Sequence, residues 1–191
     1  MSLLDTTLAH IVPVDTTLFE RAQTHLDIQT KPQGSLGLLE DIARRMFAIA
    51  GGKAPAADPA RIYTCAGDHG VAAQGVSLFP QEVTRQMVLN FMNNGAGINV
   101  LTKTAGVDLK VVDAGCKGGA FPEHPALIQC KVAPGTEDFT KTAAMTRAQC
   151  IAALENGIRL ADEAQKEGYK TIGTGEMGIA NTTPATALYS A

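Results

Sequence analysis

Residues 169–184 read YKTIGTGEMGIANTTP, and the order of residue types in this stretch decides the fold. Residues 169–173 are typical of a short strand, residues 175–181 form a Gly-rich loop, and Pro184 suits the first turn of a helix. The stretch therefore predicts a strand, a loop and a helix in succession, which is the unit from which parallel sheets are built.

The same alternation runs through the sequence before it. Strands are predicted at residues 61–66, 109–113 and 127–132. Helices are predicted at residues 18–26, 34–50, 80–91, 95–104 and 146–168. Thr146 and Gln149 have the spacing of a capping box at the start of the last of these helices. Alternating strands and helices indicate an α/β fold with a mostly parallel sheet, whose ligands gather at the carboxyl ends of the strands.

The helix predicted at residues 34–50 is amphipathic, and Ser35 is placed to cap it. Its apolar residues repeat at helical spacing and are expected to face the core: Leu36, Leu39, Ile42, Met46 and Ile49. A Gly-, Ala- and Pro-rich connection follows at residues 51–59. We therefore expect an N-terminal helical segment over residues 1–50 and an α/β domain over residues 51–191.

The composition is that of a globular protein, with 45% hydrophobic and 18% charged residues among 191. A net charge of -3 and scattered Lys and Arg residues argue against a nucleic-acid partner. No apolar run approaches the roughly 20 residues of a membrane helix. The four cysteines are widely spaced and suit free thiols, which predicts a soluble protein of a reducing compartment, the cytoplasm.

The loop in the opening stretch allows more than one interpretation. Gly173, Gly175 and Gly178 match the G-x-G-x-x-G dinucleotide pattern, but Glu176 would face the anionic pyrophosphate, which disfavours such a site. In a second interpretation the loop approaches a substrate, Glu176 accepts a proton or a hydrogen bond, and Asn181 lies beside a helix N-terminus that favours anions. In a third, the glycines only make a tight turn, a threonine caps the helix and Glu176 is solvated.

Two further segments carry residues with chemical potential. His69 follows a predicted strand, yet no second histidine or acid recurs at ligand spacing, so the sequence implies no metal and favours a satisfied or exposed histidine. Leu78 and Phe79 precede a helix that carries Gln86, so an aromatic base could lie on the two apolar side chains while Gln86 reaches its edge. Alternatively, Phe79 staples the helix start and Gln86 faces water.

Three segments together carry a resemblance that is more specific than these patterns. They are KPQGSLGLLE at residues 31–40, the run from Gly67 to Val88 with GDHGV and GVS, and GEMGIANTT at residues 175–183. In content, order and spacing they resemble the nicotinate-nucleotide:dimethylbenzimidazole phosphoribosyltransferase family. The similarity covers nearly the whole chain.

The resemblance implies a Rossmann-like parallel sheet with a small helical domain, in a homodimer that works without a metal or other cofactor. The implied reaction moves phosphoribose from nicotinate mononucleotide to 5,6-dimethylbenzimidazole, giving α-ribazole 5'-phosphate and nicotinate for the lower ligand of cobalamin. Glu176, Gly178 and Asn181 match positions near the nucleotide and the reacting centre, with Glu176 as the catalytic group. The residues that match the base side are Leu78, Phe79, Gln86 and Met177.

The chain also departs from the family. Family members are considerably longer, and their proposed general-base glutamate and much of their phosphate site lie in the C-terminal half. We therefore expect residues 51–191 to be the N-terminal portion of the α/β domain, cut short at its C-terminus. A non-catalytic protein that binds benzimidazole or a nucleotide, or an inactive fragment, is the alternative. Ala180 stands where the family commonly has glycine, and its methyl group could narrow the loop without changing the chemistry.

Overall fold

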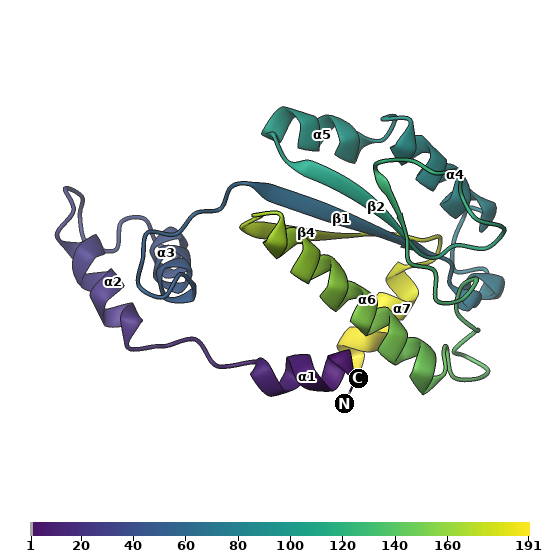
Figure 1. The fold of residues 1–191 in the computed structure, drawn as a ribbon, viewed down its shortest axis with the longest axis horizontal. Coiled ribbons are helices and arrows are strands. Elements are labelled where there is room, and N and C mark those ends of the chain that lie inside the picture. Colours follow the sequence, from purple (N-terminus) through teal and green to yellow (C-terminus); the bar gives the residue numbers. More distant parts are fainter. Residues whose placement is uncertain (1) are drawn as a thin grey trace. The chain divides into compact units, whose positions relative to one another are not determined.

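The structure is a computed structural model that describes residues 2–191. The chain divides into two compact units. One is helical and comprises Asp5–Ala57, and the other comprises Asp58–Ala191 with residues 2–4 and contains the sheet (Figure 1). Within residues 2–191, no helix is both long and apolar enough to cross a membrane.

The helical unit is built on α2 (Leu18–Asp27) and α3 (Leu38–Ile49), which follow α1 (Leu3–His10). Helices α2 and α3 contact each other, and each buries one alanine, Ala22 and Ala48. These small residues allow two short helices to approach closely.

The loop between α2 and α3 closes on a buried ion pair. Lys31 Nζ donates to Glu40 Oε1 at 2.7 Å, and the backbone N–H of Leu36 donates to the same oxygen at 3.2 Å. The hydrogen bond from Lys31 lowers the pKa of Glu40. Both charged side chains are largely shielded, with 13% of Lys31 and 7% of Glu40 exposed. The Glu40 carboxylate therefore holds both the beginning of this loop, at Lys31, and its later part, at Leu36.

Helix α3 differs from its prediction in two respects. It begins at Leu38, because Gly34 and Gly37 adopt left-handed backbone angles that end any helix before it, and Ser35 does not cap it. The apolar residues expected in the core are exposed, apart from the half-buried Met46: Leu36, Leu39, Ile42 and Ile49. Helical periodicity identifies an apolar stripe but does not identify what covers it.

The second unit is organised around a four-stranded sheet in the order β3-β2-β1-β4. The strands are β1 (Ala60–Gly67), β2 (Asp108–Gly115), β3 (Leu127–Gln129) and β4 (Thr171–Met177). Every neighbouring pair is parallel, which confirms the predicted α/β fold with a parallel sheet. Parallel pairing brings the carboxyl ends of all four strands to one edge.

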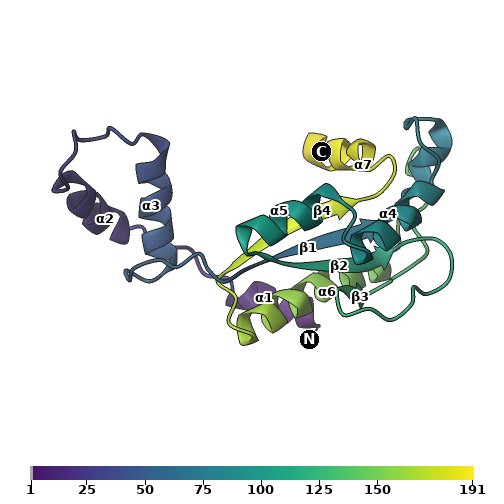
Figure 2. The ribbon, with the colours of Figure 1, turned by 90° about the horizontal axis from the view of Figure 1, so that it is seen from above.

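Helices cover both faces of this sheet (Figures 1 and 2). On one face, Val88 and Phe91 of α4 (Glu82–Met92) pack with Val111 of β2, and α5 (Gly97–Ala105) follows α4. On the other face, Leu160 and Ala164 of α6 (Arg147–Lys166) pack against Tyr63 and Val112. A short 3-10 helix, η1 (Gly70–Gln74), follows β1, and α7 (Thr182–Ser190) follows β4.

The predicted capping box of α6 is confirmed. The backbone N–H of Gln149 donates to Thr146 Oγ1 at 3.2 Å, and the Gln149 side chain accepts from the backbone N–H of Thr146 at 2.8 Å. Two backbone donors at the helix start are thereby satisfied by local sequence alone.

Strand β4 extends further than the sequence predicts. The Gly-rich segment expected to be a loop from Gly175 continues as strand to Met177, because Glu176 and Met177 stay in register with Cys65 and Ala66 of β1. A Cβ on Gly175 would lie 3.1 Å from Thr64 Oγ1 of the neighbouring strand. This glycine therefore makes room within the sheet and does not form the turn.

Two other boundaries were predicted wrongly. Strand β3 ends at Gln129 and not at 132, although the backbone N–H groups of Cys130 and Val132 still donate to the Asp113 and Ala114 carbonyls of β2. Helix α4 begins at Glu82, so Pro80 precedes the N-cap residue Gln81 and lies outside the first turn. Pro80 still helps the helix start, because its carbonyl accepts from the backbone N–H of Val83 at 3.2 Å.

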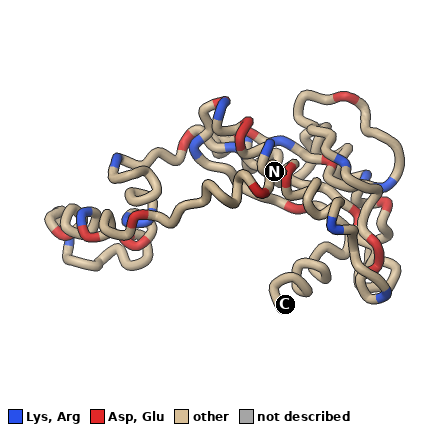
Figure 3. The backbone as a smooth tube through the Cα atoms, turned by 60° about the horizontal axis from the view of Figure 1, so that its bottom comes forward, with Lys and Arg blue, Asp and Glu red and all other residues tan. Residues whose placement is uncertain are grey.

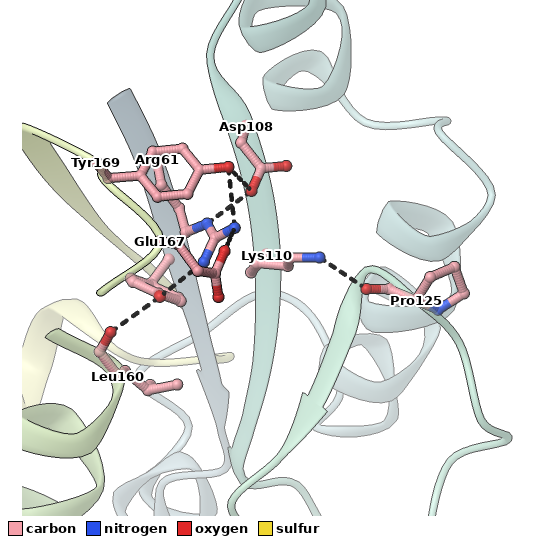
Figure 4. A network of polar contacts seen from close by, with 8 residues as sticks. Arg61, Asp108, Lys110, Pro125, Leu160, Glu167 and Tyr169 are labelled. Carbon is pink, nitrogen blue, oxygen red and sulfur yellow. Dashed lines mark hydrogen bonds and ion pairs between the residues drawn. The ribbon is translucent and has the colours of Figure 1, made fainter. Parts of the chain in front are cut away.

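A buried arginine ties together the amino ends of the strands (Figure 4). The guanidinium of Arg61 donates to Asp108 at 2.6 Å, to Glu167 at 2.7 Å, to the Tyr169 hydroxyl at 3.0 Å and to the Tyr63 hydroxyl at 3.3 Å. Its carbon also lies 4.0 Å from the centre of the Tyr169 ring. This network joins β1, β2 and the end of α6 at the edge of the sheet opposite the predicted site.

Candidate functional site

The side chains of His69 and Glu176 meet at the carboxyl ends of β1 and β4. His69 follows β1, Glu176 lies near the end of β4, and the distance from His69 Nε2 to Glu176 Oε1 is 3.1 Å. The His69 side chain is 15% exposed, whereas the Glu176 side chain is 45% exposed. Sequence analysis did not predict that the two side chains meet, because they are 107 positions apart and no spacing rule connects them.

Gly178 is what allows these two strand ends to approach. It is buried, and a Cβ at this position would lie 2.3 Å from the Gly67 carbonyl oxygen and 2.7 Å from His69 Nε2. No side chain fits there without displacing the backbone of β1 or the histidine ring. Gly178 therefore permits a close approach among the protein's own residues at this edge of the sheet.

Asp68 is a second acid at this edge of the sheet, beside His69. It is 3% exposed, and its Oδ2 accepts from the backbone N–H of Lys117 at 2.7 Å. Among the described residues, no group donates to its buried Oδ1. Buried carboxylate oxygens without donors are uncommon, and a catalytic role is one of the reasons for which they occur. The sequence signal was its position directly after a strand, but nothing distinguished it from a loop acid.

The irregular segment after β3 holds this loop in place. The backbone N–H of Thr136 donates to the Asp68 carbonyl at 2.9 Å, and Thr136 Oγ1 accepts from the backbone N–H of Gly70 at 3.2 Å. Gln74 donates to Asp138 at 2.6 Å. That hydrogen bond is the largest cause that lowers the pKa of Asp138, to about 2. A segment without secondary structure thus fixes the residues after β1.

Gln86 borders a cleft of about 500 Å³ between α4 and the loop after β2. The cleft is also lined by Asp68, Gln81, Arg85 and Lys117. Within it, Lys117 Nζ donates to Gln81 Oε1 at 2.6 Å. The Gln86 side chain is exposed and borders this space. Its exposure fits both interpretations from the sequence, in which Gln86 either faces water or contacts a ligand.

The other residues predicted on the base side occupy different environments. Leu78 is 99% exposed and Phe79 is 64% exposed, so Phe79 does not staple the start of α4. Met177 is partly buried and packs against the core cluster beneath α4. The structure therefore brings Gln86 to a cleft, leaves Leu78 and Phe79 free on the surface, and gives Met177 a packing role.

Asn181 lies at the N-cap position of α7, where the third interpretation of the loop would place a threonine. Its side chain makes no capping hydrogen bond, and α7 itself carries no charged residue (Figure 3). The preceding turn is anchored to α4, because the backbone N–H of Ile179 donates to the buried Thr84 Oγ1 at 3.0 Å. The start of α7 is thereby held close to Gly178 and to the carboxyl end of β4.

The site supports acid–base and hydrogen-bond chemistry more readily than thiol or metal chemistry. Burial raises the pKa of Cys65, and it raises that of Cys116 to about 12, which leaves both thiols protonated and poorly nucleophilic. Among residues 2–191, no three His, Cys, Asp or Glu side chains gather closely enough to hold a metal ion. The exposed carboxylate of Glu176 is the group best placed to meet a substrate.

Comparison with known proteins finds relatives whose similarity extends over almost the whole chain. The family model DBI_PRT, described as phosphoribosyltransferase, matches residues 11–191. A nicotinate-nucleotide–dimethylbenzimidazole phosphoribosyltransferase of Oleidesulfovibrio alaskensis is 64% identical over 185 residues, which cover 96% of this chain and 52% of the relative. A protein of the same name from Nitratidesulfovibrio vulgaris is 64% identical over 182 residues, covering 95% of this chain and 51% of the relative.

Solved structures agree with these matches. The crystal structure of the nicotinate-nucleotide–dimethylbenzimidazole phosphoribosyltransferase from Thermus thermophilus superposes with a TM-score of 0.86 at 43% identity. The superposition covers 91% of this chain and 52% of the solved one. The chain thus spans about half the length of the curated relatives and solved structures that it matches.

Proposed function

Because this chain belongs to the DBI_PRT phosphoribosyltransferase family, we propose that its protein transfers phosphoribose from nicotinate mononucleotide to 5,6-dimethylbenzimidazole. The products would be α-ribazole 5'-phosphate, which serves the lower ligand of cobalamin, and nicotinate. The observation that carries the proposal is the exposed Glu176 carboxylate at the carboxyl end of β4, within the segment that matches the family most specifically.

The reaction needs few chemical groups. A nitrogen of the benzimidazole attacks C1' of the ribose with inversion, the bond from C1' to the nicotinate nitrogen breaks, and the benzimidazole N–H proton passes to a base. A carboxylate near the reacting centre can accept a proton or orient a donor, and backbone N–H groups at a helix start favour a phosphate. We assign to Glu176 the role of a carboxylate at the reacting centre, beside the general-base glutamate that the family has in its C-terminal half. We assign contacts with the nucleotide to the backbone of Gly178, in the turn after β4, and to Asn181 at the N-cap of α7.

We assign the base to the other side of the site. Gln86, which borders the cleft beside α4, would reach the edge of the ring, while the exposed Leu78 and Phe79 would cover its face. The half-buried Met177 would contact the base from the end of β4, with little movement because it packs in the core cluster. Base preference would then depend on the shape of the space among these four side chains.

The experiment that tests the proposal is a transfer assay with the complete gene product that contains this chain. The protein is incubated with nicotinate mononucleotide and dimethylbenzimidazole, and α-ribazole 5'-phosphate is quantified by chromatography. We expect product to appear with an equal amount of nicotinate. Calorimetric titration with each substrate serves as the parallel measurement. Binding of both substrates without product would overturn transfer in favour of a non-catalytic binding protein.

We also propose that the protein is a cytoplasmic homodimer. The family resemblance supports the dimer, and the four free cysteines support a reducing compartment. Sedimentation equilibrium of the complete gene product would measure its assembly state. A concentration-independent monomer mass would contradict the dimer.

A further inference from the structure

The contact between His69 and Glu176 fixes where one proton lies. When Glu176 is ionised, its carboxylate can only accept hydrogen bonds, so the 3.1 Å contact requires that the histidine nitrogen Nε2 carries the proton and donates it. A neutral His69 ring is then the Nε2–H tautomer, and its Nδ1 is unprotonated. Only one nitrogen of a neutral histidine can be a donor, so this contact selects one tautomer over the other.

The histidine is the rigid partner of the pair. Its ring is 15% exposed and lies against Gly178, whose missing side chain leaves it just enough space. Its backbone carbonyl accepts from Gln81 Nε2 at 2.8 Å. The next residue, Gly70, is held equally closely, because a Cβ there would lie 2.3 Å from the backbone of Glu137. These contacts limit the positions that the ring can adopt.

Glu176 is the adaptable partner. Its side chain is 45% exposed, and the contact with His69 through Oε1 is the hydrogen bond that the structure gives it. A free glutamate side chain samples many rotamers, and ordering it costs side-chain entropy. A hydrogen bond from a fixed ring reduces that cost before substrate arrives, and it leaves Oε2 free to face the site.

We infer that His69 is a positioning residue for Glu176: it holds Oε1 so that Oε2 is presented to the substrate. This inference rests on the proposed function, because it assigns the orientation of the carboxylate to which that function gives its chemistry. His69 acts through Glu176 and is not itself assigned a contact with substrate. Gly178 is the structural condition for the arrangement, since any side chain there would displace the ring.

The kinetic test compares two variants of His69 with a control. His69→Ala removes the donor, whereas His69→Gln places an amide N–H near the original Nε2. His25→Gln alters an exposed histidine of α2 and serves as the matched control. We expect His69→Ala to lower kcat by roughly 10- to 100-fold with little change in KM for the base, because misplacement of a reacting group mainly affects the transition state. His69→Gln should recover most of the lost rate, and His25→Gln should keep the wild-type rate.

A double-mutant cycle separates positioning from a general structural role. If His69 acts through Glu176, then His69→Ala should cost almost nothing further in a Glu176→Gln background. Losses that multiply in the double variant, a His69→Gln rate no better than that of His69→Ala, or an unchanged kcat in His69→Ala would each overturn the inference. Thermal unfolding of every variant verifies that the compared proteins are folded.

A second measurement is independent of activity. Nitrogen-15 NMR of the imidazole groups at alkaline pH reports which ring nitrogen carries the proton. We expect His69 to be the Nε2–H tautomer in the wild-type protein and to lose this bias in Glu176→Ala. An Nδ1–H tautomer in the wild type would overturn the inference even if transfer activity is present. A protein with the expected tautomer but no transfer activity would instead overturn the proposed function and leave the contact established.

Discussion

The two edges of the sheet handle charged side chains in opposite ways. At the amino edge, the Arg61 side chain is 6% exposed and its donors are met by two carboxylates and two tyrosine hydroxyls. At the carboxyl edge, Asp68 has a buried oxygen without a donor among the described residues, and Glu176 presents a half-exposed carboxylate. Both edges belong to the same parallel strands, so strand geometry does not account for the difference.

The difference indicates that the amino edge mainly contributes to stability and the carboxyl edge to function. A fully paired network at one edge stabilises the strand order, while the half-exposed carboxylate of Glu176 at the other edge remains available to a substrate. The carboxyl edge also contains backbone strain, since Ala180 has a φ of 71° that L-residues rarely adopt. Mutations at the amino edge should therefore change stability and spare the rate, and mutations of the exposed groups at the carboxyl edge should do the reverse.

The largest effect is expected for Arg61→Ala. The substitution removes the buried donor of Asp108 and Glu167, whose side chains are themselves partly exposed. Hydrogen bonds to charged groups contribute about 1.5–3 kcal/mol each, so we expect a loss of about 3 kcal/mol in the free energy of unfolding. Urea unfolding followed by circular dichroism measures this loss, and kcat of the folded protein should be unchanged. Arg159→Ala, which breaks an exposed pair with Glu155, is the control and should cost less than about 1 kcal/mol. Equal losses in the two variants would show that the amino-edge network has no special role.

A second, slightly smaller effect is expected at the carboxyl edge. Glu176→Gln keeps the size of the side chain but removes its charge and its ability to accept a proton. We expect kcat in the complete gene product to fall by about 100-fold, which corresponds to about 2.7 kcal/mol, while binding of the base changes much less. Steady-state kinetics and calorimetry measure the two quantities. An unchanged kcat would mean that Glu176 is a structural residue.

The amino edge should also respond to acid, with a smaller effect than removal of Arg61. Burial works against ionisation of Asp108, but hydrogen bonds from Arg61 and Tyr169 outweigh it and lower its pKa. A carboxyl with a lowered folded-state pKa stabilises the fold above its unfolded pKa of about 4, and this contribution is lost as the pH falls through the folded value.

The measurement is the urea midpoint between neutral pH and the acid range. We expect the urea concentration at the midpoint to decrease as the pH is lowered below about 4. This decrease should be smaller in Asp108→Asn, because the side chain at position 108 no longer titrates. The same pH dependence in Asp108→Asn and wild type would assign acid sensitivity to other carboxyls.

The smallest effect is expected for Ala180→Gly. Glycine relieves the left-handed strain of about 1–2 kcal/mol, partly offset by its greater entropy in the unfolded chain, so a net gain of about 0.5–1 kcal/mol is expected. Ala161→Gly, at an exposed position within α6, is the control and should instead lose about 1 kcal/mol. A loss in both variants would show that the Ala180 methyl group contributes more by packing than it costs in strain.

Local sequence was sufficient for much of the fold. The alternation of strands and helices predicted the parallel sheet, and the spacing of Thr146 and Gln149 predicted the start of α6. These features depend on residues within one or two turns of each other, so their signals lie in short windows of sequence. The family relationship was likewise readable from three segments, and the match over residues 11–191 confirms it.

Contacts over long separations could not be read in this way. The extension of β4 to Met177 depends on pairing with β1, and the exposure of Leu39 and Ile42 on α3 depends on what packs against that helix. A charged arginine is expected on the surface, and the burial of Arg61 is explained only by its partners from β2 and the end of α6.

The sequence by itself determined the α/β fold, the family and the Gly-rich segment that contains Glu176. Only the tertiary structure decided that His69 meets Glu176, because the register of β1 against β4 aligns their carboxyl ends and Gly178 lets them approach. Local propensity acts over a few residues, whereas a site at the edge of a parallel sheet is assembled from strand ends that lie far apart along the chain, here 107 positions.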